Sequence, residues 1–190
     1  IKAETDDTKT VQHGYFKDKD VTDRKLTDWS GTWQSVYPYL LDGTLDEVWE
    51  YKADASKGEE TAQEVKDYYT TGYKTDVEKI IIDGKKNTVT FVQNGEEHKY
   101  IYKYVGYKIL KYEKGNRGVR YLFEAKDDNA GDFKYIQFSD HNISSTKAEH
   151  FHLFWGSTSQ KAILKEMDNW PTYFPASKSG QEIAQDLVAH

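Results

Sequence analysis

From residue 76 to residue 156 the hydrophobic positions fall in short runs separated by polar turn residues, a pattern typical of β-strands. β-branched and aromatic residues gather there in short runs, and these residue types are typical of half-buried strands. Turn sequences such as Asn94-Gly95 separate the runs. The pattern predicts strands at 77–82, 88–93, 99–105, 107–112, 119–125, 133–138 and 150–155.

Short strands joined by hairpin-like turns predict a meandering antiparallel sheet. Closing such a sheet into a barrel removes its two edges, which would otherwise be free to pair with other chains. The expected fold is therefore mainly β, an antiparallel β-barrel with several flanking α-helices.

Helices are expected before the strand region. Residues 37–75 have a helical pattern, in which Thr44 and Glu47 form a capping-box sequence for one helix. A second helix is expected at about 59–69.

Helices are also expected after the strand region. Ser157 and Gln160 have capping-box spacing, and Pro171 would end the helix that they begin. Ser179 and Glu182 have the same spacing near the end of the chain. The sequence thus places helices on both sides of the predicted barrel.

The length of 190 residues is that of one domain. Residues 1–10 are polar and lack periodicity, which predicts a linker or disordered lead-in, and residues 11–190 are expected to form the single domain. Because the sequence begins at Ile1 without a methionine, we expect it to be a piece of a longer chain.

Charge and composition exclude several functions. The chain has 26 Lys and Arg against 32 Asp and Glu, a net charge of −6, which argues against nucleic acid as a partner. No apolar run approaches the roughly 20 residues of a membrane span, so no direct membrane insertion of this segment is expected. The absence of cysteine excludes disulfides, thiolate metal sites and cysteine nucleophiles.

Three of the six histidines lie within twelve residues: His141, His150 and His152. In a strand, His150 and His152 share a face because they are two residues apart. A polar stretch that predicts a turn separates them from His141, so the chain could fold back and place His141 opposite the pair. Three imidazoles without a thiol suit Zn²⁺ and leave a fourth tetrahedral position open. The alternative is a polar strand face with unrelated histidines.

The other three histidines carry weaker signals. His13 follows the lead-in and could supply the fourth ligand, which could equally be water or a carboxylate. His98 follows two glutamates near a turn and is interpreted as a solvated strand residue. His190 is the last residue and is expected to be frayed.

Charged residues near the predicted site have structural interpretations. Asp140 and Glu149 each precede a histidine, so in a strand each points away from its neighbour and is interpreted as a supporting or solvated group. Arg120 and Glu124 share a strand face and are interpreted as a structural ion pair. Nothing in their setting indicates catalysis.

Several sequence blocks resemble known proteins. Gly31-Thr32-Trp33 resembles the G-x-W motif in the first strand of lipocalin-type barrels, in which an arginine near the end of the barrel often covers the Trp; Arg120 is the candidate here. Larger blocks resemble the ZinT (YodA) family of bacterial zinc-binding proteins over nearly the whole chain, from about Gly14 to His190. These blocks are 106–110, 118–124, 134–141, 150–152 and 166–173.

The resemblance implies a lipocalin-like (calycin) barrel that binds Zn²⁺ through His141, His150 and His152. It also implies an extracytoplasmic location, in the periplasm or at the cell surface, and support of zinc uptake by an ABC importer. Together with the start at Ile1, it suggests the C-terminal domain of an AdcA-type zinc lipoprotein, in which a cluster A-I solute-binding domain comes first. We expect no enzyme activity.

Two other functions stay open on the sequence. Three histidines and a water also form a catalytic zinc site, so the chain could be a zinc-dependent hydrolase or a carbonic-anhydrase-like enzyme. A lipocalin-like barrel could instead carry an apolar ligand in a wide, dry cavity, although this barrel is expected to be crowded with tyrosine and lysine.

Overall fold

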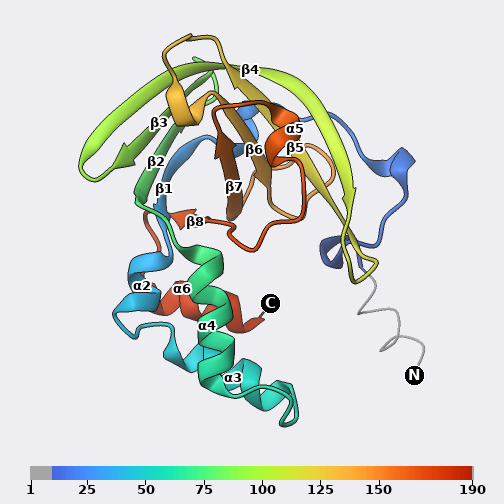
Figure 1. The fold of residues 1–190 in the computed structure, drawn as a ribbon, viewed down its shortest axis with the longest axis vertical. Coiled ribbons are helices and arrows are strands. Elements are labelled where there is room, and N and C mark those ends of the chain that lie inside the picture. Colours follow the sequence, from blue (N-terminus) through green and yellow to red (C-terminus); the bar gives the residue numbers. More distant parts are fainter. Residues whose placement is uncertain (1–9, 190) are drawn as a thin grey trace.

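A computed structural model describes residues 10–189, in which eight strands form a closed antiparallel barrel (Figure 1). Each strand pairs with the next along the chain, and the last pairs with the first. The mainly β fold expected from the sequence is confirmed. The strands are β1 (Gly31–Ser35), β2 (Val77–Asp83), β3 (Thr88–Gln93), β4 (Glu96–Lys111), β5 (Arg117–Ala125), β6 (Tyr135–Ser139), β7 (Phe151–Gly156) and β8 (Thr172–Pro175).

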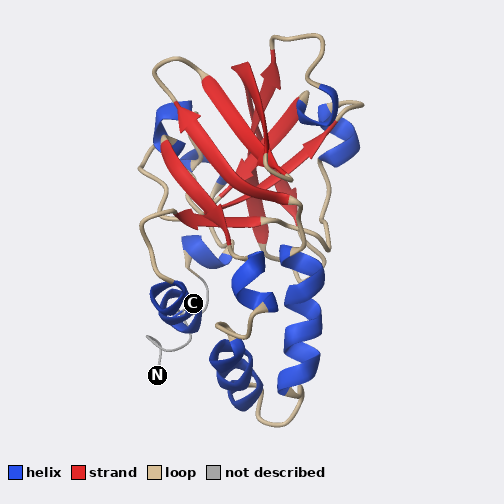
Figure 2. Cartoon of the chain, turned by 90° about the vertical axis from the view of Figure 1, so that its left-hand side faces the viewer, coloured by secondary structure: helices blue, strands red, loops and turns tan. Residues whose placement is uncertain are grey.

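Most of the helical residues lie together below one end of the barrel, as Figures 1 and 2 show. The helices in this group are α2 (Tyr37–Leu41), α3 (Asp46–Ala55), α4 (Ala62–Tyr73) and α6 (Gly180–Ala189). A short helix, α5 (Gln160–Ile163), contacts β7 instead. The 3-10 turns are η1 (Val11–His13), η2 (Asp18–Asp20), η3 (Leu26–Trp29) and η4 (Gly131–Phe133). None of the helices in the described residues is long and apolar enough to cross a bilayer.

The predicted strands at 99–105 and 107–112 are wrong as separate elements, because both belong to the long strand β4. The register of β4 against β5 shifts between Tyr104 and Gly106, and Gly106 has a φ of 111°. The glycine therefore marks a bulge that bends one strand rather than a turn between two. The strand pattern also missed β1 and β8, which have only five and four residues.

The predicted capping box at Thr44 is wrong. The backbone N–H and hydroxyl of Thr44 both donate to Asp42, at 2.9 and 2.6 Å, and α3 begins two residues later without a side-chain cap. A capping box does begin α4, where Glu64 N–H donates to Thr61 Oγ1 and Thr61 N–H donates to Glu64 Oε1. Asp42 prevails at Thr44 because it offers a closer acceptor in a turn.

The C-terminal capping predictions have mixed outcomes. The residue that caps α5 is Ser159, not Ser157, and its hydroxyl accepts from the backbone N–H of Ala162 at 3.1 Å. The reciprocal bonds between Ser179 and Glu182 confirm the second box, at the start of α6. The predicted lead-in at 1–10 lies, apart from residue 10, outside the described residues, as does His190.

Aromatic side chains fill the inside of the barrel. Trp29 stacks on Phe138 with ring centroids 4.5 Å apart, and Trp33 contacts Phe151 edge-on at 4.8 Å. All four are at most 2% exposed. A second apolar cluster, which includes Trp49, joins the helical group below the barrel. The barrel interior is thus a packed core, and the helical group has a core of its own.

Arg120 has neither of the predicted contacts. Its guanidinium lies 3.7 Å from the ring centroid of Phe154, while the cation over Trp33 is the ammonium of Lys147, at 5.6 Å. The predicted pair with Glu124 is not among the ion pairs of the described residues. Arg120 instead donates to Gln137 and to the carbonyls of residues 163 and 165, and so fixes the segment after α5 against β5.

Candidate metal centre

The three predicted histidines lie where β6 and β7 meet at one end of the barrel. Ser139, the last residue of β6, pairs with His152 on β7. The chain leaves β6 through His141 and returns through His150, the residue before β7 begins. Because the two strands are antiparallel neighbours, the loop between them brings His141 back to the other two, as the turn in the sequence predicts.

The histidine pair faces away from the core. Phe151 lies between the two histidines and is fully buried inside the barrel, as is Leu153 on the other side of His152. Since successive side chains of a strand point to opposite faces, His150 and His152 lie on the outer face. Phe151 and Leu153 therefore pack in the barrel core, whereas His150 and His152 lie on the face that forms the candidate site.

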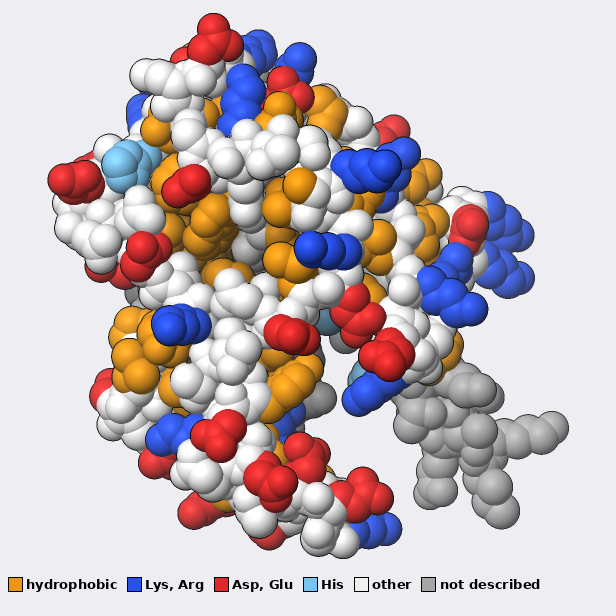
Figure 3. Space-filling view, viewed as in Figure 1, with side chains coloured by type: hydrophobic (Ala, Val, Ile, Leu, Met, Phe, Trp, Pro, Cys, Tyr) orange, Lys and Arg blue, Asp and Glu red, His pale blue; other side chains and the backbone are white. Residues whose placement is uncertain are grey.

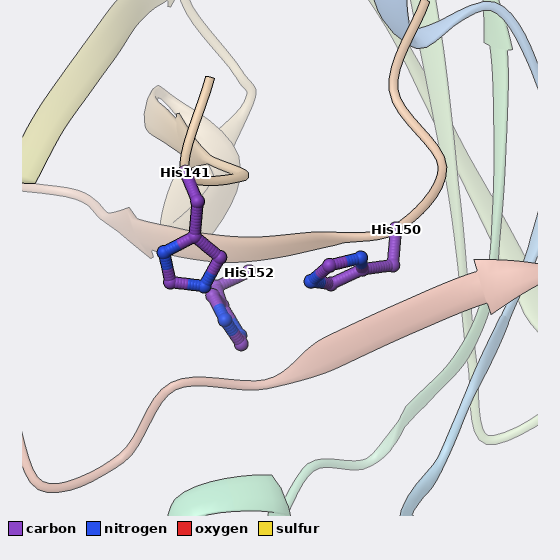
Figure 4. Close-up of side chains that lie close together, drawn as sticks. All are labelled: His141, His150 and His152. Carbon is purple, nitrogen blue, oxygen red and sulfur yellow. The ribbon is translucent and has the colours of Figure 1, made fainter. Parts of the chain in front are cut away.

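The three imidazoles converge, as Figure 4 shows. One potential ligand atom from each of His141, His150 and His152 lies within 4.8 Å of those of the other two. In a tetrahedral zinc site the ligand nitrogens lie about 3.3 Å apart, because Zn–N bonds are about 2.0–2.1 Å long. Small rotations of the rings would close the difference, so the arrangement fits a borderline metal that binds imidazole.

Hydrogen bonds fix the tautomer of His152. Its Nδ1 lies 2.7 Å from Thr172 Oγ1, and the Thr172 hydroxyl donates to the carbonyl of Trp170 at 2.8 Å. Because the Thr172 hydroxyl donates its proton to Trp170, its oxygen acts as the acceptor for the N–H at Nδ1 of His152. This leaves the lone pair of Nε2 free for a metal, the usual arrangement behind a histidine ligand.

Electrostatics keep His152 neutral. Burial lowers its pKa well below 6.5, electrostatic interactions with His141, His150 and Arg120 lower it further, and a smaller effect of the Trp170 backbone raises it. Only a neutral imidazole can bind a metal. The low pKa therefore keeps this side chain ready for metal at neutral and mildly acidic pH.

The other two histidines are held differently. The ring of His150 stacks on Phe174 of β8, with centroids 5.1 Å apart and an interplanar angle of 13°. His141 is exposed, lies outside the strands and has a φ of 67°, in the left-handed region. Such a backbone is costly for a residue other than glycine, so neighbouring contacts must stabilise it.

The site opens into a cleft of about 720 Å³ between the barrel and the helical group. Tyr68, Tyr69 and Tyr73 of α4 line it together with the three histidines and Trp170. Figure 3 shows this face hollowed between barrel and helices, with histidine side chains in the hollow. An ion can therefore reach the imidazoles from solvent.

The remaining predicted residues take various places. His13 in η1 lines the same cleft and has its Nδ1 2.7 Å from Thr10 Oγ1, and the exposed Glu149 also lines the cleft. Asp140 is 4% exposed and binds neighbouring groups, so its interpretation as a supporting residue agrees with the structure. His98 lies on strand β4, as expected, and is half-buried rather than fully solvated, with its ring stacked on that of Phe133 at 5.8 Å.

Sequence reasoning missed the residues that support the histidines from other strands. Thr172 and Phe174 lie on β8, and they reach His152 and His150 only because β7 and β8 pair. No local pattern around these residues signals that role. The only sequence signal is that both lie in the 166–173 block or directly after it.

The chain is similar to known zinc-binding proteins. A family model described as ZinT (YodA) periplasmic lipocalin-like zinc-recruitment matches residues 7–190. The zinc-binding protein AdcA of Streptococcus pyogenes serotype M3 is 65% identical over 190 residues, all of this chain and 37% of that protein. The zinc-binding lipoprotein AdcA of Streptococcus pneumoniae serotype 4 is 63% identical over 189 residues, again 37% of its length. The chain thus spans little more than a third of these relatives.

Two further matches cover a larger share of the matched protein. The probable metal-binding protein YrpE of Bacillus subtilis is 52% identical over 97% of this chain and 72% of its own length. The crystal structure of the Zn(II)-bound ZinT-like domain of Streptococcus pneumoniae AdcA superimposes with a TM-score of 0.92 at 62% identity, covering 95% of this chain and 99% of that one.

Proposed function

Because the chain belongs to the ZinT (YodA) family of lipocalin-like zinc-recruitment proteins, we propose that it captures Zn²⁺ through His141, His150 and His152. The observation that carries the proposal is the convergence of one nitrogen from each imidazole within 4.8 Å. A solved relative of 62% identity is Zn(II)-bound, which supports the same cargo here.

The chemistry of the donors suits reversible capture. Three neutral imidazoles leave one tetrahedral position for water or another ligand, so the ion is not enclosed as in a four-thiolate structural site. The cleft gives that position access to solvent. An open site with all-nitrogen protein ligands can accept zinc and release it again.

We further propose an extracytoplasmic role within a longer protein. The family is described as periplasmic, and a relative from Streptococcus pneumoniae is named a lipoprotein. The AdcA relatives are longer than this chain, which matches 37% of their length. On the family resemblance, we propose a cluster A-I solute-binding domain in the same protein and an ABC zinc importer as partners.

The test is zinc titration by calorimetry. The native chain should bind one Zn²⁺, and a His150→Ala/His152→Ala variant should lose at least a hundredfold in affinity because two of three ligands are gone. His98→Ala is the matched control, since His98 stacks on Phe133 away from the cluster. Equal affinities in the native chain and the double variant would refute the proposal.

We infer binding rather than catalysis. The relatives carry the names of zinc-binding proteins. In the described residues, aromatic side chains pack against one another inside the barrel, where an apolar ligand would have to lie. Zinc-dependent CO₂ hydration or ester hydrolysis that disappears in the double variant would instead identify an enzyme.

A further inference from the structure

A buried arginine joins the N-terminal segment of the domain to the loop that carries His141. The Arg24 side chain is fully buried, and its guanidinium donates to both carboxylate oxygens of Asp140, at 2.6 and 2.9 Å. It also donates to Asp28 at 2.8 Å and to the carbonyl of Thr146 at 3.0 Å. The ring of Trp29 covers it, 4.1 Å from the guanidinium carbon. This bidentate, water-excluded pair is geometrically specific.

Asp140 directly precedes His141 and holds the backbone on its far side as well. Its carboxylate accepts from the backbone N–H of Asn142 at 3.1 Å and from the Asn142 side chain at 3.2 Å. The bond to residue 142 closes a turn across His141, whose φ is 67°. Short-range aspartate turns of this kind stabilise such a left-handed residue.

The rest of the loop is tied to the same segment. Asp28 accepts from the Ser145 hydroxyl and from the backbone N–H of Thr146, and its own carbonyl accepts from Ala148 N–H. The backbone N–H of Thr22 donates to Ile143 at 2.9 Å. Residues 22–28 thus contact the loop along most of its length.

We propose that Arg24 and Asp140 are positioning residues for zinc capture, which preset His141 against the other two ligands. The proposal rests on the zinc site proposed above. His150 and His152 are placed by β7 and its neighbours, whereas His141 is an exposed loop residue. Without the Arg24–Asp140 pair the loop would have to become ordered when zinc binds, and that entropy would be lost from the affinity.

The test compares zinc affinities in a double-mutant cycle. Arg24→Lys keeps the positive charge but cannot pair with both carboxylate oxygens, and Asp140→Asn keeps the shape but removes the charge. Each should weaken zinc binding about 10- to 100-fold, the usual effect of losing a group that orients a metal ligand. In a His141→Ala background the same substitutions should change the affinity less than about threefold, because the residue on which they act is absent.

Tyr102→Phe is the control for general destabilisation. It removes a buried hydrogen bond to the carbonyl of Phe133, at 2.6 Å, and neither residue belongs to the histidine loop. Its zinc affinity should equal that of the native chain. Circular dichroism of the zinc-free proteins shows which variants fold. If Arg24→Lys and Asp140→Asn both fail to fold, Ser145→Ala tests the positioning role instead. Loss of its hydrogen bonds to Asp28 should weaken zinc binding about two- to fivefold.

The outcomes separate the two proposals. If His141→Ala binds zinc as tightly as the native chain, the three-histidine site is wrong. If His141→Ala weakens zinc binding but the folded Arg24→Lys and Asp140→Asn variants do not, the zinc site stands and the positioning role is refuted. An equal loss in the native and His141→Ala backgrounds would also refute it, since the effect would then be independent of His141.

Discussion

Replacing Thr172 by valine tests whether hydrogen bonding prepares His152 for metal. The substitution keeps the volume and the branched shape of a side chain that is 1% exposed on β8. It removes one oxygen, which accepts from His152 Nδ1 and donates to the carbonyl of Trp170. The imidazole then loses the partner that selects the tautomer with a free Nε2.

The expected size of the effect follows from these two bonds. Loss of the group behind a histidine ligand typically lowers metal affinity about 10- to 100-fold. The free energy of unfolding of the zinc-free protein should fall by about 1–3 kcal/mol, because the two hydrogen bonds that the Thr172 hydroxyl makes to buried groups are lost. Thr172→Ser retains the hydroxyl and should restore most of the affinity.

The assay is competitive zinc titration against a chelating dye, with chemical denaturation of the same zinc-free proteins. Zinc affinity should fall in the valine variant and recover in the serine variant. An affinity for zinc that is the same in Thr172→Val and in the native chain would show that His152 selects its tautomer without Thr172. Equal weakening by serine and valine would point to packing on β8 instead.

Two further predictions concern stability. At free zinc one thousand times the Kd, binding should add about 4 kcal/mol to the free energy of unfolding and raise the Tm by about 8–16 °C, measured by calorimetry with and without EDTA; an unchanged Tm would contradict metal binding to the folded state. Because the pKa of His152 is held well below 6.5, the unfolded chain takes up its proton first as the pH falls. Relative to His152→Gln, the free energy of unfolding of the zinc-free native chain should therefore fall by up to about 1.4 kcal/mol per pH unit between pH 6.5 and the pKa of His152 in the folded protein. If the free energies of unfolding of the two proteins had the same pH dependence, this prediction would be contradicted.

The sequence predicted the barrel where its local signals and the tertiary structure agree. The runs at 77–82 and 88–93 correspond to β2 and β3 because β-branched and aromatic residues and the turns that bound them act over a few neighbouring positions. It failed where long-range contacts decide. β8 (Thr172–Pro175) has only four residues, follows a proline and ends in another, so it has no strand signal in the sequence. It forms a strand because it pairs with β1 and β7 and so closes the barrel.

The candidate site shows the same division. The spacing of His150 and His152 and the turn after His141 are local, so the sequence could predict the convergence of the three. Arg24 lies 116 residues before Asp140, and Thr172 lies 20 residues after His152. Such partners are set by strand pairing and by the path of the N-terminal segment, and no periodicity within the chain encodes them.

The two faces of β7 have separate tasks, which makes the site removable without loss of the fold. Phe151 and Leu153 are fully buried in the barrel core, whereas the flanking histidines face the cleft. The zinc-free His150→Ala/His152→Ala variant should thus keep the fold and lose less stability than Phe151→Ala, because it removes one hydrogen bond to Thr172 and the stacking of His150 on Phe174 but opens no cavity in the barrel core. Phe151→Ala should cost about 3–5 kcal/mol, because it leaves a cavity among packed aromatic rings. Thermal unfolding of both variants checks this. If the histidine variant were the less stable of the two, the imidazoles would be part of the core, and its loss of zinc binding would reflect unfolding rather than missing ligands.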